Sequence, residues 1–174
     1  MQSQHICRIR EINMRLFILR HGEAEQYAAF DVDRRLTERG ERDSKNVGLF
    51  CAKANIHFTH IFVSPFTRAK QTAQLVAEQL PPAPIEETEF LTPSTDPKNL
   101  FELLRSFTSE SRVLCVTHEP FASTCISTLI SGTESSHVVM KPATIACIET
   151  DGPPTRGNGK LVWMVSPETM RSIG

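Results

Sequence analysis

Arg20, His21 and Gly22 stand directly after a short apolar run, and Arg68 and His118 follow similar runs later in the chain. An arginine guanidinium forms planar, two-point hydrogen bonds with phosphate oxygens. A neutral imidazole can attack phosphorus and hold the phosphoryl group covalently until water removes it. These residue types together indicate chemistry on a phosphoryl group.

Cationic side chains beside such a nucleophile would stabilise the negative charge that develops on the phosphoryl oxygens in the transition state. Two arginines and a second histidine can supply that stabilisation without Mg²⁺. The sequence also has no GxxxxGK[ST] loop for nucleotide phosphates and no clustered aspartates for a divalent cation. We therefore expect an enzyme that needs neither a metal ion nor another cofactor.

Short apolar runs alternate with helical patterns along the chain, which is typical of an α/β sheet with crossover helices. The expected strands are residues 15–19, 60–63, 112–117, 144–148 and 160–165. Helices are expected to start after the N-cap Thr37, at Pro65, at Pro97 and at Pro120. In open α/β sheets, ligands bind at the carboxyl ends of the strands. The four ionisable side chains are expected to meet at that edge.

The composition is that of an ordinary folded protein. Of the 174 residues, 40% are hydrophobic, which is close to the average for soluble globular proteins. The 19 lysines and arginines against 20 acidic residues give a net charge of -1, so no basic face for nucleic acid is expected. No apolar run reaches the roughly 18 residues that a membrane-spanning helix needs. Nothing in the composition indicates an oligomeric state.

One domain covering residues 14–174 is expected, because domains have on the order of 150 residues. Residues 1–13 precede the first strand and are expected to be an N-terminal extension without the apolar segment of a secretory signal. The cysteines number 5, an odd count, and no two of them have C-x-x-C spacing. Reduced thiols and a cytoplasmic location are therefore expected.

Four segments, in this order, resemble motifs of the histidine phosphatase superfamily. They are LRHGEAE at 19–25, RRLTERG at 34–40, SPFTRAKQTA at 64–73 and VTHEP at 116–120. Their close spacing, together with TEFLTP at 88–93, is similar to that of the small SixA-type phosphohistidine phosphatases. The resemblance extends from about residue 14 to residue 132 and continues weakly through the last strands.

The resemblance implies a three-layer α/β/α sandwich with a mostly parallel central sheet. It also implies that His21 is the phosphorylated nucleophile and that Arg20, Arg68 and His118 complete the phosphate pocket. In such folds the glycine of the Leu-Thr-x-x-Gly motif, here Gly40, allows its helix to pack closely near the site.

Larger members of the superfamily have a helical insertion that covers the pocket and supplies a glutamate as proton donor. Here only residues 81–95, which include Pro81, Pro82 and Pro84, separate two expected helices, so the lid insertion is expected to be absent. Glu89 lies in the corresponding region but does not match that glutamate well. The candidate proton donors are Glu23, Asp31 and Asp33, of which Glu23 and Asp31 rank equally.

A missing proton donor matters least when the leaving group is itself stable. An imidazole, with an unperturbed pKa of about 6.5, leaves phosphorus with far less help than an alkoxide does. An open pocket also admits a side chain that protrudes from another protein. Both points favour phosphohistidine on a signalling or phosphotransfer protein as the substrate.

Two other functions stay open at this stage. The first is a phosphatase that acts on a small phosphate ester or a phosphoanhydride. The second is a phosphoprotein-binding module without catalysis, although a module that only binds would need the arginines and not the imidazole of His21.

Overall fold

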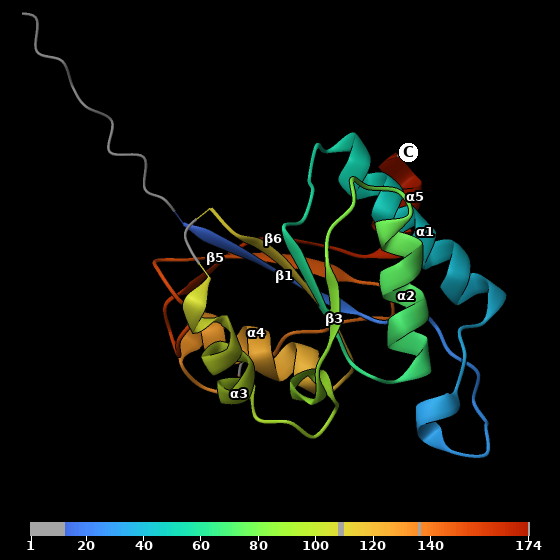
Figure 1. Cartoon of the computed structure of the whole chain (residues 1–174), viewed down its shortest axis with the longest axis horizontal. Coiled ribbons are helices and arrows are strands. Elements are labelled where there is room, and N and C mark those ends of the chain that lie inside the picture. Colours follow the sequence, from blue (N-terminus) through green and yellow to red (C-terminus); the bar gives the residue numbers. More distant parts are fainter. Residues whose placement is uncertain (1–12, 108–109, 136, 174) are drawn as a thin grey trace, which may run out of the picture.

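A six-stranded sheet forms the centre of the molecule (Figure 1), for which a computed structural model describes residues 13–107, 110–135 and 137–173. The strand order is β3-β2-β4-β1-β5-β6. The strands are β1 (Met14–Arg20), β2 (His60–Val63), β3 (Ile85–Glu87), β4 (Arg112–Thr117), β5 (Ile145–Thr150) and β6 (Gly159–Val165). The first four strands in this order are parallel, and β5 and β6 are antiparallel to their neighbours. The predicted, mostly parallel sheet is confirmed.

Strand β1 shows why this sheet needs a layer of helices on each face. Leu16 and Ile18 are buried in one hydrophobic cluster, and Phe17 and Leu19 are buried in a second cluster on the opposite face. Successive side chains of a strand point to opposite faces, so a continuous apolar run requires both faces to be covered. The sequence of β1 therefore dictates the central layer of a three-layer fold.

The helices supply the two outer layers. One face is covered by α1 (Glu38–Lys53), α2 (Thr67–Ala77) and α5 (Pro167–Ile173), and the other by α3 (Pro97–Leu103) and α4 (Phe121–Ser131), as Figure 1 shows. Three 3₁₀ turns are η1 (Asp31–Asp33), η2 (Glu89–Leu91) and η3 (Leu104–Ser106). The predicted α/β/α sandwich is thus confirmed.

The predicted N-cap Thr37 is found, and two further residues cap helix ends. The Thr37 side chain accepts a hydrogen bond from the backbone N–H of Gly40, and the Asp96 side chain accepts one from that of Lys98. Gly132 ends α4 in the left-handed conformation, with φ of 74°.

Three details of the expected fold differ in the structure. The second helix begins at Thr67, not at Pro65, because Ser64 continues the sheet by donating its N–H to the carbonyl of Val116. Ala54 continues the apolar spacing of Val47, Phe50 and Cys51, which predicts that it is buried, but it is exposed and caps the helix end. The short elements β3 and α5 were not predicted.

Residues 78–96, all of which are described, connect α2 to α3 through β3 and η2. This short connection contains no α-helix, so the expected absence of the lid insertion is confirmed. Within the described part of the chain, no helix has the length and apolar character needed to cross a membrane.

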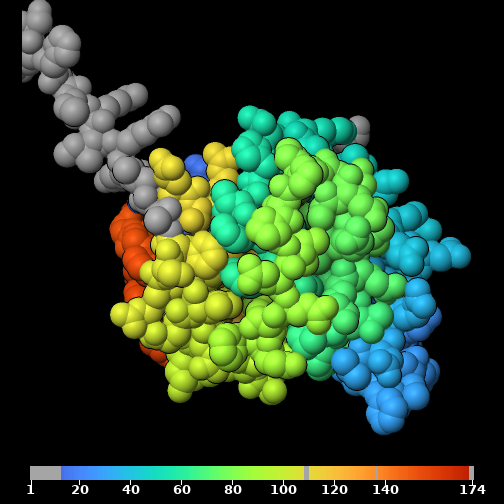
Figure 2. All heavy atoms as spheres, viewed as in Figure 1, coloured from blue at the N-terminus to red at the C-terminus, as the bar shows by residue number. Residues whose placement is uncertain are grey.

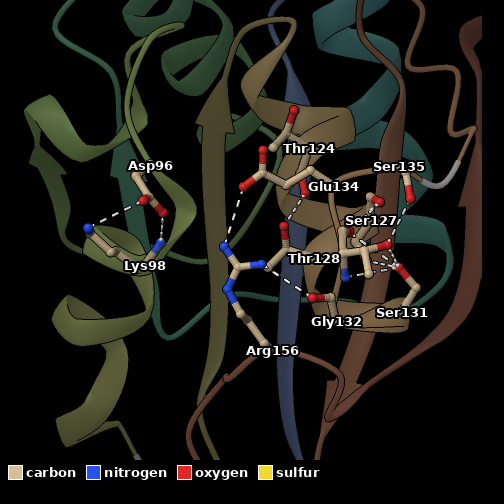
Figure 3. Close-up of polar contacts among 11 residues, drawn as sticks. Asp96, Lys98, Thr124, Ser127, Thr128, Ser131, Gly132, Glu134, Ser135 and Arg156 are labelled. Atoms are coloured by element: carbon tan, nitrogen blue, oxygen red, sulfur yellow. Dashed lines mark hydrogen bonds and ion pairs between the residues drawn. The ribbon is translucent and has the colours of Figure 1, made fainter.

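The β5–β6 hairpin is tied to the end of α4 (Figure 3). The Arg156 guanidinium donates to the Gly132 carbonyl and pairs with the Glu134 carboxylate, both at 3.3 Å. The N–H of Gly157 donates to the carbonyl of Thr128 at 3.0 Å. These contacts join the antiparallel part of the sheet to the helix that follows β4.

That residues 14–174 form one domain stays a prediction, which the single sheet built from residues 14 to 165 supports. The predicted N-terminal extension, residues 1–13, lies outside the described residues except for Asn13.

Candidate active site

His21 is fixed in place by the two segments that lie beside the end of β1. Its backbone N–H donates to the carbonyl of Thr117 on β4 at 2.9 Å, and the N–H of Gly22 donates to the Thr72 hydroxyl on α2 at 3.0 Å. A Cβ atom on Gly40 would lie 2.0 Å from the carbonyl oxygen of Glu23. The expectation that Gly40 lets α1 pack closely beside the site is therefore confirmed.

The hydrogen bonds of the His21 ring define which nitrogen carries the proton. Nδ1 lies 2.6 Å from the carbonyl oxygen of Gly22. A carbonyl only accepts hydrogen bonds, so the hydrogen must be on Nδ1 and Nε2 must carry a lone pair. Nε2 in turn accepts a hydrogen bond from Nε of Arg68 at 3.2 Å.

Burial also keeps the imidazole of His21 neutral. The residue is 8% exposed, and its burial lowers the pKa to about 3, an effect that the charges of Arg68 and Arg20 reinforce and the bond to Gly22 opposes. A neutral imidazole with an Nε2 lone pair is the form required of a nucleophile.

His118 lies beside His21 at the end of β4, with the two ring planes inclined at 57°. The two ring centroids are 4.9 Å apart, and His118 is 1% exposed. Its Nε2 lies 2.7 Å from the Ser64 hydroxyl, while its buried Nδ1 has no hydrogen-bond partner among the described residues. Burial lowers the pKa of His118 to about 3, and the neighbouring His21 and Arg68 act in the same direction. His118 is therefore neutral as well.

The guanidinium of Arg68 is held in the site by Asp31. Nη1 donates to the Asp31 backbone carbonyl at 2.6 Å, and Nη2 donates to its carboxylate at 3.0 Å. The ring of Phe66 lies 5.0 Å from the guanidinium carbon. Because Nε points at His21, all three donor groups of the fork have defined directions.

Arg20 provides a second, half-buried cation. Its Nη1 donates to the carbonyl of Met140 at 2.6 Å, and its Nε is buried without a hydrogen-bond partner in the described structure. Burial lowers the pKa of this guanidinium, and the charge of Glu119 opposes that shift. Arg20 is also near enough to both imidazoles to lower the pKa values of His21 and His118.

The structure thus brings His21, His118, Arg68 and Arg20 together at the carboxyl edge of the sheet, where the sequence predicted them. Their catalytic and binding roles remain proposals. Sequence reasoning missed Ser64, which contacts His118, and the pairing of Asp31 with Arg68. The Ser-Pro pair at the end of β2 was a usable signal for Ser64.

The candidate proton donors occupy different settings. Hydrogen bonding and ion pairing with Arg34, and also with Arg68, lower the pKa of Asp31 and favour its ionised form. In that form Asp31 holds the guanidinium of Arg68 and has no proton to donate. Glu23 accepts a hydrogen bond from the Thr37 hydroxyl at 3.0 Å, and Asp33 lies in η1. A donor role for either stays a prediction.

The buried thiols belong to the core and not to this site. Cys51, Cys115, Cys125 and Cys147 are free and buried, as expected. In the described ranges, no group of three or more histidine, cysteine, aspartate or glutamate side chains is arranged to hold a metal ion.

Protein stability should depend on pH because both imidazoles are neutral when buried. Between pH 6.5 and about 3 the unfolded chain binds protons that the native His21 and His118 do not, so stability falls as the pH falls. Each histidine contributes a slope of at most about 1.4 kcal/mol per pH unit. Urea unfolding between pH 6 and 5 should show a shallower slope for His118→Asn than for the wild type. Equal slopes would contradict the buried neutral state of His118.

A sheet whose carboxyl edge presents two buried imidazoles, a buried arginine and a half-buried one is typical of an α/β phosphatase that uses histidine. Residues 16–92 match the family model of the histidine phosphatase superfamily (branch 1). The phosphohistidine phosphatase SixA of Escherichia coli K12 is 31% identical over 157 residues, which cover 88% of this chain and 94% of SixA. The chain therefore belongs to the histidine phosphatase superfamily and is a phosphatase.

Solved structures agree with this assignment. The protein histidine phosphatase SixA in complex with tungstate superimposes with a TM-score of 0.80 and 31% identity, covering 88% of this chain and 97% of that one. A phosphoserine phosphatase from Entamoeba histolytica, in complex with 3-phosphoglyceric acid, has a TM-score of 0.66 and 18% identity, and the match covers 90% of this chain and 99% of that one. The second likeness concerns the fold alone. The resemblance to SixA-type phosphatases is confirmed.

Proposed function

We propose that this phosphatase removes phosphate from a phosphorylated histidine on another protein, such as a signalling or phosphotransfer protein, through a phospho-His21 intermediate. The observation that carries this proposal is the state of the His21 ring. Its Nδ1–H is bonded to the Gly22 carbonyl, so the lone pair of Nε2 is directed toward the guanidinium of Arg68. A phosphoryl anion attracted by that guanidinium would place its phosphorus next to Nε2.

The groups around Nε2 fit a tetrahedral anion. Arg20 Nε is a buried donor without a partner in the described structure. If the Ser64 hydroxyl donates to Nε2 of His118, the proton of that ring is on Nδ1, which becomes a second such donor. A charged hydrogen bond to each of these atoms would satisfy them when the phosphoryl group binds.

The reaction has two displacements at phosphorus. In the first, Arg68 Nε transfers its hydrogen bond from His21 to a phosphoryl oxygen, and the freed lone pair of His21 Nε2 attacks phosphorus. The bond between phosphorus and the substrate nitrogen breaks, its electron pair stays on that nitrogen, and the departing imidazole takes up a proton from solvent water. In the second, water attacks phosphorus and the bond to Nε2 breaks, which yields inorganic phosphate and neutral His21. The Gly22 carbonyl stabilises the positive charge on the ring of the intermediate.

The cations of the site make a metal ion unnecessary for charge stabilisation in this mechanism. Arg20 and Arg68 provide the positive charge, and His118 provides a hydrogen bond, in place of the charge stabilisation that Mg²⁺ supplies in other phosphoryl-transfer enzymes. We therefore expect chelators such as EDTA to leave the rate unchanged.

A phosphorylated side chain of a protein is favoured as substrate by two features. The imidazole leaving group, with an ordinary pKa of about 6.5, departs without a strong acid. The short connection at residues 78–96 leaves the site without a covering helix. SixA, whose name describes it as a phosphohistidine phosphatase, has been solved with tungstate, which like phosphate is a tetrahedral oxyanion.

A phosphatase of small phosphate esters or phosphoanhydrides is the alternative. The fold is shared with a phosphoserine phosphatase. Comparing kcat/KM on a histidine-phosphorylated protein with kcat/KM on a panel of metabolite phosphates separates the two functions. A higher value on any ester or anhydride would overturn the proposed substrate.

Trapping the intermediate tests the mechanism. The wild-type enzyme is mixed with radiolabelled phosphohistidine protein and quenched in alkali before one turnover is complete. We expect label on the enzyme that is stable in alkali, is lost in acid and maps to the peptide containing His21. Acid-stable label, or label on another peptide, would overturn a phospho-His21 intermediate. A cytoplasmic location stays a prediction, which the free, buried thiols support.

A further inference from the structure

Exposed aromatic side chains occur on segments that are bonded to the residues of the site just described. Tyr27 is 85% exposed, Phe30 is 68% exposed and Phe90 is 40% exposed. Single exposed apolar residues are ordinary, but a group of them marks an interaction surface. We define the aromatic rim as these three residues and the half-buried Phe66.

The first part of the aromatic rim belongs to the loop between β1 and α1. This loop projects from the body of the molecule, as its blue atoms show in Figure 2. Phe30 directly precedes Asp31, whose carbonyl and carboxylate accept hydrogen bonds from Arg68. The projecting loop, with Tyr27 and Phe30, is therefore fastened to the phosphate-binding arginine.

The second part of the aromatic rim belongs to two segments that follow strands β2 and β3. Phe90 is in η2, which is anchored because the hydroxyl of Thr117, next to His118, donates to the carbonyl of Leu91 at 2.7 Å. The ring centroid of Phe66 is 4.8 Å from that of His118. Apolar side chains thus come from three of the segments that position the reactive groups.

We propose that the aromatic rim binds apolar side chains that surround the phosphohistidine of a folded partner protein, an inference that rests on the proposed function. Charge complementarity between the phosphoryl anion and the guanidinium groups places the phosphorylated side chain at His21. The adjoining surface of the partner then lies against the projecting loop with Tyr27 and Phe30. Aromatic side chains provide large contact areas in protein interfaces. A small phosphate ester has no such surface, so the aromatic rim favours protein substrates.

The test uses two helix-forming peptides that carry one phosphohistidine each. Leucines stand three and four residues to either side of it in the first peptide, and serines replace them in the second. We expect wild-type kcat/KM to be at least about tenfold higher on the leucine peptide, since leucine side chains gain free energy when they are removed from water and serine side chains do not.

The variant Tyr27→Ser/Phe30→Ser should lose this preference through a higher KM on the leucine peptide with kcat unchanged. It should hydrolyse the phosphoramidate ion, a small P–N substrate, at the wild-type rate. The matched control is Val162→Ser, which changes a 50% exposed apolar residue on the edge strand β6 and should behave as wild type.

Two results would overturn the aromatic rim while leaving the proposed function intact. They are equal wild-type kcat/KM values on the two peptides, and an equal loss by the double variant on both peptides and on phosphoramidate. A wild-type enzyme that hydrolyses esters but no P–N substrate would overturn the proposed function, and the aromatic rim proposal with it.

Discussion

Replacing His21 by alanine is expected to lower kcat on a phosphohistidine protein by more than about 10³-fold, because the attacking atom itself is removed. The other donors of the site remain in His21→Ala, so the substrate should still bind. Phosphate release under single-turnover conditions is the measurement, with wild type and variant side by side.

The matched control for this experiment is His137→Ala. His137 is exposed, and its removal leaves the site unchanged, so its rate should equal that of the wild type. Near-wild-type activity of His21→Ala would contradict covalent catalysis by this residue. A loss of the native fold in His21→Ala is recognised by circular dichroism and would call for His21→Gln, which keeps most of the buried volume.

Replacing Arg68 by alanine is expected to lower kcat by about 10²–10³-fold, the range found when one donor to a developing oxyanion is removed. Arg68→Lys should be impaired nearly as strongly. A lysine ammonium keeps the charge but cannot bond to the Asp31 carbonyl, the Asp31 carboxylate and His21 in the directions that the planar guanidinium defines.

The variant Asp31→Asn removes the carboxylate that holds Arg68 in position but keeps the charge of Arg68. The side chain of Asp31 is 58% exposed, and ion pairs of this kind contribute about 0–1 kcal/mol. We therefore expect less than a tenfold loss of kcat, against the much larger loss in Arg68→Ala. A loss in Asp31→Asn as large as that in Arg68→Ala would assign the carboxylate a direct part in the chemistry.

Long or chemically marked elements were predictable from the sequence. The run Leu16–Leu19 of β1 is apolar on both faces of the strand. The N-caps Thr37 and Asp96 each precede a helical pattern. By contrast, β3 is three residues long and exposed, and α5 is seven residues long. Both are too short for a hydrophobic period of two or of 3.6 to be visible. Helix α2 starts late because a contact with β4, distant in sequence, keeps Ser64 in the sheet.

The same distinction applies to the site. Arg20, His21, Arg68 and His118 were found because each follows a strand, and strand ends of a parallel sheet share one edge. The hydrogen bonds of Arg68 to Asp31 and of Ser64 to His118 were not predicted from the sequence, because they depend on side-chain directions in three dimensions. Asp31 carries no sequence mark that distinguishes it from Asp33.

The hydrogen bond from Arg68 Nε to His21 Nε2 has a consequence for reaction selectivity. In the resting enzyme the only lone pair of the ring is occupied, and a hydrogen bond to a charged donor contributes about 1.5–3 kcal/mol. An uncharged electrophile, such as a carboxylic ester, cannot form a comparable hydrogen bond with the guanidinium. The Nε2 lone pair then stays bonded to Arg68 and is a weaker nucleophile. An anionic substrate accepts the hydrogen bond of Arg68 in place of His21, and this frees the Nε2 lone pair for attack. The enzyme should therefore react only with anionic compounds.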